Sequence, residues 1–264
     1  MCTVTIVPLG GAVPEVGRST AESAARVRTI RMACNRDELR CRPAALGPLV
    51  RQFGKRQAIM PVDPVSDGTW IAINDAGLAA TLLNVNLSRA DGEMEGSRTL
   101  SRGTLIPRLM GCSTLSEAQA LNEAIDPQRY PPFRLVLMDD RQIAEFYSDG
   151  KTMRHKQEKV GDRPHLLTSS GLGDALVEGP RRELFEQLFT QDGDWKTVQE
   201  AFHRHSWPNR KHLSVCMERD DARTVSHTII DIEPQRVVLT YFPDAPDRTG
   251  ALAPISLVRT GLHA

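Results

Sequence analysis

The sequence predicts an α+β protein in which antiparallel β-hairpins alternate with amphipathic helices. Three segments, 68–84, 135–147 and 228–241, each hold two short apolar runs on either side of a turn signal. In the first segment the turn is 74–77, where Gly77 occupies a position that favours positive φ. Tandem βαβ spacing is absent, as are the glycine-rich nucleotide-binding motifs. The pattern therefore favours layers of antiparallel sheet and helix over a doubly wound parallel sheet.

The composition is that of an ordinary globular protein. The chain has 264 residues, of which 40% are hydrophobic and 25% charged, and we expect them to form a single domain over 1–264. Lysine plus arginine equals aspartate plus glutamate at 33 each, so no nucleic-acid or anionic-membrane partner is predicted.

Three further observations indicate a cytoplasmic location. Five cysteines, an odd number, argue against a disulfide framework and for a reducing compartment. No stretch approaches the ~18 apolar residues that a membrane span needs. Residues 1–16 lack the basic and cleavage-site features of a signal peptide.

Two alternating segments near the start of the chain predict strands. Residues 3–7 alternate polar and apolar side chains, and 29–35 do so again before a polar cluster, with Pro43 ending regular structure. Between them, 10–17 is rich in glycine and 15–28 is polar, which predicts a loop.

Three helices are expected between the hairpins. Thr114 and Glu117 form a capping-box pattern that opens a helix toward Ile125. Pro180 suits the first position of a second helix with its apolar stripe at Leu184, Phe185, Leu188 and Phe189. Asp194 suits the N-cap of a third, with Trp195, Val198 and Phe202 facing the core.

Cys2 is the strongest candidate for chemistry. A second residue this small normally allows removal of Met1, which would leave a thiol and a free α-amine on one residue. An α-amine titrates near about 8 and can take the proton of a thiol whose pKa is about 8.5. The alternative is a small buried hydrophobe that happens to occupy position two.

The polar run Asn35-Arg36-Asp37-Glu38 is the second candidate. An arginine near a thiol lowers its pKa, and an aspartate can hold an α-amine in place. Without Cys2, a solvated strand end explains the run equally well.

These residues resemble the NRDE family, also called the Transport and Golgi organisation protein 2 family. Similar blocks follow one another along nearly the whole chain: Met1-Cys2-Thr3, 33–38, 68–73, 84–86, 101–106, and 169–171 with Ala175, Leu176 and Pro180. That family is similar in turn to the choloylglycine hydrolase and penicillin acylase branch of the N-terminal nucleophile (Ntn) hydrolases. The resemblance implies a four-layer αββα sandwich of two antiparallel sheets.

The resemblance also implies roles for five residues. Cys2 would be the nucleophile and its α-amine the base, with Arg36 and Asp37 beside it. Asn84 would donate to the oxyanion, and Arg223 would match a late active-site arginine. The family pattern departs at 169–171, where those hydrolases place a second oxyanion asparagine and this chain has none.

Two functions remain open at this point. The first is an N-terminal-cysteine hydrolase that cleaves an amide or thioester bond of a small molecule through an acyl-enzyme. The second is a non-catalytic binding or trafficking protein for lipid, acyl-CoA or haem, which the missing asparagine favours; a scaffold that binds a partner peptide is a third reading. No cofactor or metal is expected, because His203, His205 and His212 lack acidic or cysteine partners at ligand spacing. No feature of the sequence specifies an oligomeric state.

Overall fold

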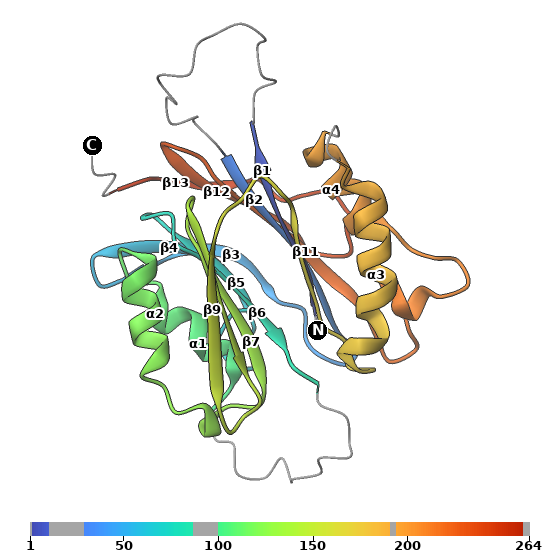
Figure 1. Cartoon of the computed structure of the whole chain (residues 1–264), viewed down its shortest axis with the longest axis horizontal. Helices are drawn as coiled ribbons and strands as arrows, with labels where there is room; N and C mark the ends of the chain where they lie inside the picture. The colour runs from blue at the N-terminus through green and yellow to red at the C-terminus, as the bar shows by residue number, and fades with distance from the viewer. Residues whose placement is uncertain (1, 11–28, 87–99, 191–193, 261–264) are drawn as a thin grey trace, which may run out of the picture.

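Two antiparallel β-sheets form the centre of the molecule (Figure 1). The computed structural model describes residues 2–10, 29–86, 100–190 and 194–260. The first sheet has the strand order β10-β1-β2-β11-β12-β13, with β1 (Cys2–Leu9), β2 (Thr29–Leu39), β10 (His165–Thr168), β11 (Ala222–Ile232), β12 (Arg236–Phe242) and β13 (Ile255–Val258). The second sheet runs in order from β3 to β9, with β3 (Leu46–Phe53), β4 (Arg56–Val62), β5 (Ile71–Asn74), β6 (Ala79–Asn84), β7 (Phe133–Met138), β8 (Gln142–Ser148) and β9 (Met153–Lys159).

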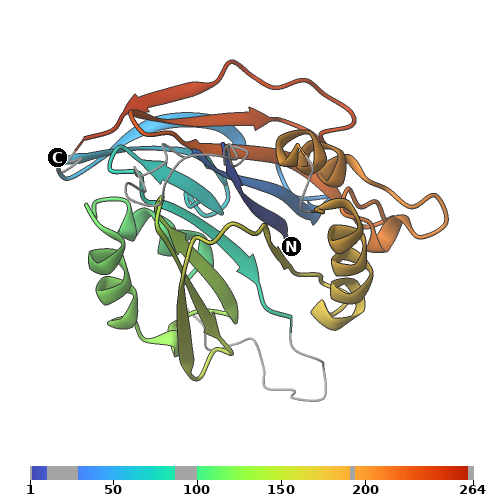
Figure 2. The ribbon, with the colours of Figure 1, turned by 45° about the horizontal axis from the view of Figure 1, so that its top comes forward.

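Helices cover the outer face of each sheet, as Figures 1 and 2 show from two directions. The pair α3 (Asp174–Leu188) and α4 (Trp195–Arg204) contacts β1, β2 and β10 of the first sheet. The pair α1 (Leu105–Leu109) and α2 (Leu115–Glu123) packs on β6, β7 and β8 of the second. Short 3-10 helices also occur: η3 (Arg102–Thr104), η4 (Pro127–Arg129) and η5 (Lys211–Leu213). The result is the αββα layering that the resemblance implied.

Side-chain alternation decides which face of the first sheet meets which layer. In β1, Cys2, Val4 and Ile6 belong to the apolar core between the sheets. The intervening residues Thr3 and Thr5 contact α3 and α4 through hydrogen bonds. Strand β1 therefore presents apolar side chains to the core between the sheets and two buried threonines to the helices.

The three predicted hairpins are confirmed. They correspond to β5–β6, β7–β8 and β11–β12. Gly77 has φ 87°, and the Asn74 side chain accepts the backbone N–H groups of Ala76 and Leu78. That local hydrogen bonding explains why the four-residue turn forms where its sequence predicted it.

Two predicted helix starts are also confirmed. The Thr114 hydroxyl accepts the N–H of Glu117 at 3.2 Å, and Asp194 accepts that of Lys196 at 3.1 Å. The helix after Thr114 ends at Glu123, two residues before the predicted end. In α4 the buried residues are Phe202 with the polar Gln199 and His203, because this helix packs on the polar face of the sheet.

The predicted start of α3 at Pro180 is wrong. The helix begins at Asp174, so Pro180 lies in its second turn. Asp174 accepts the N–H of Ser170 at 2.8 Å, and Gly173 has φ 109°, a conformation that favours glycine. These two local features begin the helix six residues before the proline.

Strand β2 extends further than its alternation predicted. It continues through the polar run to Leu39, so Arg36 pairs with Cys2 and Glu38 with Arg223. The loop expected over 11–28 lies outside the described residues, and 10 is the last described residue before it. No helix in the described part of the chain is long and apolar enough to cross a membrane.

Candidate active site

A polar pocket of about 180 Å³ opens between the two sheets at the start of β1. It brings together three of the residues singled out from the sequence, Cys2, Arg36 and Asn84. Its other lining residues come from β2, the β2–β3 and β4–β5 connections, β6, and η3 with the residue before it: Glu38, Arg42, Asp63, Ser66, Thr69, Trp70, Leu82, Ser101, Arg102 and Gly103. Residues from both sheets are therefore needed to form one cavity.

Cys2 lines this pocket and is 3% exposed. Its backbone N–H donates to the Ser169 hydroxyl at 3.1 Å, and its carbonyl accepts the Ser169 N–H at 2.9 Å. A hydrogen bond from the Cys34 thiol lowers the pKa of the Cys2 thiol, with a smaller lowering from the charge of Arg36, against the opposing effect of burial. The backbone of Cys2 is thus fixed on both sides, and its surroundings favour the thiolate.

Arg36 lies directly across from Cys2 in the β1–β2 ladder. Its guanidinium is stacked 4.4 Å from the centroid of the Trp70 ring, a cation–π contact. It also lies 3.2 Å from Glu38 and 3.6 Å from Asp63. The arginine is thus fixed by one aromatic and two acidic neighbours on one wall of the pocket.

Arg42 completes the charged group at the pocket. Its guanidinium donates to the Asp63 carboxylate at 2.6 Å and lies 3.6 Å from Glu38. Burial alone would raise the pKa of Asp63, but the hydrogen bond and charge of Arg42 lower it overall. Asp63 therefore stays ionised, and its ion pairs link the β4–β5 connection to Arg36 and Arg42.

Asp37 is buried on the opposite face of β2 from Arg36 and does not line the pocket. Its carboxylate accepts the Thr224 hydroxyl at 2.7 Å. Burial raises the pKa of Asp37, and the charge of Arg181 opposes that rise. The carboxylate lies close enough to Cys2 for its charge to raise the thiol pKa.

Asn35, the first residue of the polar run, connects the sheet to its helical layer. Its amide donates to the carbonyls of His203 and Val215 at 2.9 and 3.0 Å. Its oxygen accepts from His203 and His227 at 3.1 and 2.7 Å. Burial lowers the pKa of both histidines, that of His227 to about 3, so both rings are neutral donors.

Arg181 is a second buried anchor, which the sequence did not indicate. It is 1% exposed and donates to the hydroxyls of Thr3 and Thr168 at 2.8 and 2.7 Å. Its other hydrogen bonds go to the carbonyls of Leu213 and Ser214. Thr3 and Thr168 face each other immediately beside Cys2 and Ser169, so α3 holds together the two strands that carry those residues.

Asn84 ends β6 opposite Phe133, and its half-buried side chain lines the pocket. Within the described residues, the Asn84 amide has no hydrogen bond to another group. An amide donor is thus available on the wall that the second sheet contributes.

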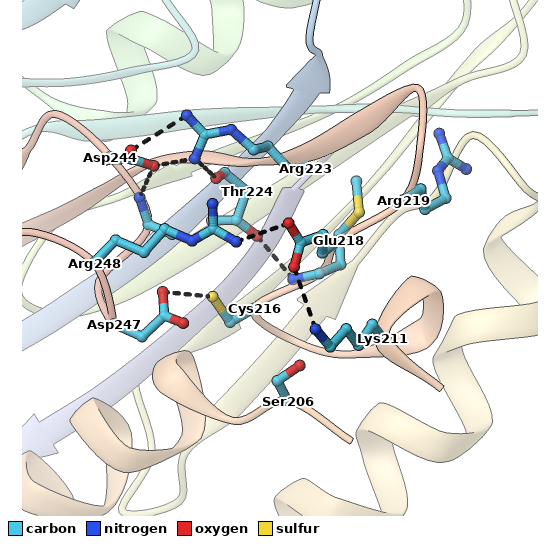
Figure 3. Close-up of polar contacts among 12 residues, drawn as sticks. Ser206, Lys211, Cys216, Glu218, Arg219, Arg223, Thr224, Asp244, Asp247 and Arg248 are labelled. Carbon is cyan, nitrogen blue, oxygen red and sulfur yellow. Dashed lines mark hydrogen bonds and ion pairs between the residues drawn. The ribbon is translucent and has the colours of Figure 1, made fainter. Parts of the chain in front are cut away.

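The structure does not bring Arg223 to this pocket. Its guanidinium pairs with the carboxylate of Asp244 (Figure 3), and Arg223 is not among the residues that line the pocket. Because neighbouring residues on a strand point to opposite faces, Thr224 rather than Arg223 reaches Asp37. The active-site role expected of Arg223 stays a prediction.

Arg223 belongs to an ionic cluster on the first sheet and the segments beside it (Figure 3). In the same cluster Glu218 pairs with Arg40, Arg248 and Lys211, and the first two lower its pKa to about 2. Each arginine there has an acidic partner, so the cluster reads as a structural network.

Several pocket residues carried no signal of their own in the sequence. Trp70 fell inside a block of the family resemblance, but Asp63 and Arg42 did not stand out as site residues, and neither did Cys34 behind the pocket. Their proximity depends on contacts between distant segments, which no local pattern reports.

The layered fold is of the Ntn-hydrolase type. An N-acylethanolamine-hydrolyzing acid amidase orthologue from Caenorhabditis elegans matches with a TM-score of 0.51 and 8% identity over 98% of this chain and 99% of that one. Penicillin V acylase from Agrobacterium tumefaciens matches with a TM-score of 0.47 and 15% identity, over 81% and 79% of the chains. The C2A mutant of conjugated bile acid hydrolase from Clostridium perfringens gives 0.41 and 11%, over 86% and 92%.

The family model described as Transport and Golgi organisation 2 matches residues 23–236, and the chain belongs to that family. The matched range contains Asn35 to Glu38 and Asn84 but begins after Cys2. No curated protein sequence matches the chain.

Proposed function

We propose that this protein is an N-terminal-cysteine hydrolase that cleaves an amide or thioester bond of a small molecule through an acyl-enzyme. The observation that carries the proposal is that the buried Cys2 lines a polar pocket, with its backbone nitrogen held by Ser169 at 3.1 Å. In this proposal Met1 is removed, and that nitrogen becomes the α-amine of the mature chain.

The α-amine is the base in this mechanism. With a pKa near about 8 it accepts the thiol proton, directly or through water, as the sulfur attacks the carbonyl carbon. The Ser169 hydroxyl, which already accepts from this nitrogen, orients it. The same amine returns the proton to the leaving group, and water then releases the acyl group from sulfur.

Asn84 is the proposed oxyanion donor. Its amide lines the pocket from the second sheet, and Cys2 lines it from the first. One such donor typically contributes about 10²–10³ in rate. Backbone N–H groups would supply the remainder.

Arg36 and Asp37 have different tasks in the proposed site. Arg36 faces the pocket opposite Cys2, and its charge favours the thiolate. Asp37, on the far side of the strand, supplies a carboxylate that holds the protonated α-amine in position. Both depend on β2 continuing past Asn35.

The pocket suits a compact polar group rather than a polymer. Its volume of about 180 Å³ and its arginine, acid and hydroxyl lining favour the polar part of a small substrate. We further propose a cytoplasmic, reducing location, consistent with five free cysteines.

A binding role on the same fold is the second candidate. The Ser169 hydroxyl is occupied by the Cys2 nitrogen, and 169–171 has no asparagine, so this segment contributes no side-chain amide to an oxyanion. Wild-type protein that binds a small-molecule ligand but does not turn it over would be a binding protein of this kind.

The test compares wild type with Cys2→Ala after intact mass has shown that Met1 is removed. Turnover of small N-acyl and acyl-thioester compounds should fall to background in the variant, while its circular dichroism spectrum is unchanged. A variant that turns over a substrate at the wild-type rate would exclude Cys2 as the nucleophile.

A further inference from the structure

A second thiol lies beside Cys2 in the core between the sheets. The β1–β2 register places Cys34 opposite Val4 and Arg36 opposite Cys2. Since side chains two residues apart share a face, Cys34 and Cys2 are diagonal neighbours on the inner face. Cys34 is fully buried in the same core, and its thiol is near enough to the Cys2 sulfur to lower the Cys2 pKa as a hydrogen-bond donor.

Cys34 also contacts the opposite sheet. The buried Thr81 hydroxyl of β6 lies against the Cys34 thiol and donates to the Trp70 carbonyl at 3.2 Å. The Trp70 ring in turn stacks on Arg36. A chain of contacts thus links Cys34 through Thr81 and Trp70 to Arg36. These contacts restrict the side chain of Cys34 to its place beside Cys2.

We propose that Cys34 is a positioning residue, whose S–H donates a hydrogen bond to the Cys2 thiolate and thereby stabilises the nucleophile. Cys34 does not touch the substrate, because it does not line the pocket and is 0% exposed. Its own proton stays in place: the bond to Cys2 and burial both raise the pKa of Cys34 well above its usual value. The inference rests on the proposed role of Cys2 as the nucleophile.

Other charges around Cys2 act in known directions. Arg36 lowers the Cys2 pKa, and Asp37 raises it. Arg181, from α3, also lies within electrostatic range of Cys2, and the α-amine of the mature chain would add a positive charge. Because all of these remain in a Cys34 variant, a change in the thiol titration isolates the contribution of Cys34.

The experiment is the pH dependence of Cys2 alkylation by iodoacetamide, measured by peptide mass spectrometry on mature protein. Cys34→Ala and Cys34→Val remove the donor, the second while refilling the space; Cys34→Ser keeps a donor. Cys112→Ala, a buried thiol in the other core, is the matched control.

In both non-donor variants, Cys34→Ala and Cys34→Val, the midpoint of Cys2 alkylation should rise by about one pH unit. Below the midpoint this rise corresponds to about tenfold less Cys2 thiolate. Cys34→Ser and Cys112→Ala should stay near wild type. Unchanged midpoints in a folded non-donor variant, or a full-unit rise in Cys34→Ser, would overturn the inference. Since alkylation needs no substrate, a midpoint shift without any turnover would reject the hydrolase and retain the role of Cys34.

Discussion

The four residues Asn35 to Glu38 occupy consecutive positions of one strand and perform four different tasks. Arg36 and Glu38 face the pocket, where they form an ion pair with each other. Asn35 and Asp37 face the helical layer, where both are almost fully buried and hydrogen-bonded. Alternation along the strand thus divides the run into a binding half and an anchoring half.

Two asparagines should respond differently to alanine substitution for this reason. Asn35→Ala removes four hydrogen bonds, two to buried carbonyls and two from the Nδ1 atoms of buried histidines, so the free energy of unfolding should fall by about 3 kcal/mol. Asn84→Ala should change it by less than about 1 kcal/mol but reduce turnover by about 10²–10³.

Urea unfolding and steady-state kinetics on the two variants separate these outcomes. Equal losses of stability in both would contradict the division into anchoring and binding residues. Full activity in Asn84→Ala would remove Asn84 from the proposed oxyanion site.

At the scale of elements, α3 is the support of the strands that carry the site. Arg181 reaches from this helix to Thr3 of β1 and Thr168 of β10. It also supplies the charge that opposes the rise in the Asp37 pKa. A buried arginine is tolerated here because four acceptors and a nearby carboxylate compensate its desolvation.

Arg181→Met should therefore lower the free energy of unfolding by about 3–5 kcal/mol. Arg182→Met is the matched control, since this next residue is exposed and pairs with Glu178 on the same helix; it should cost less than about 1 kcal/mol. Chemical denaturation of both proteins decides the matter. Similar small losses would show that Arg181 does not hold the two strands together.

At the scale of the whole molecule, the sequence predicted the layers better than the site. Hairpins with glycine turns, such as that at Gly77, and capped helices, such as that after Thr114, are signalled locally and were found. The helix start predicted at Pro180 was wrong because the start of α3 depends on Asp174 and Gly173 instead.

The site was predicted in part, through the family resemblance. Cys2, Arg36 and Asn84 meet in one pocket, whereas Arg223 pairs with Asp244 elsewhere. Cys34, Asp63 and Arg181 could not be assigned from sequence, because their contacts join strands and helices that lie far apart in the chain. Closing two sheets on one another brings these residues together.

The central claim is that Cys2 is the activated nucleophile of the mature chain. Its most direct test is the reaction of purified protein with an electrophilic acyl probe at neutral pH, with adducts located by mass spectrometry. We predict a mature chain without Met1 and an adduct on Cys2 that forms far faster than on Cys112 or Cys216, whose pKa values burial raises. A retained Met1, or a Cys2 that reacts no faster than those two thiols, would contradict the account.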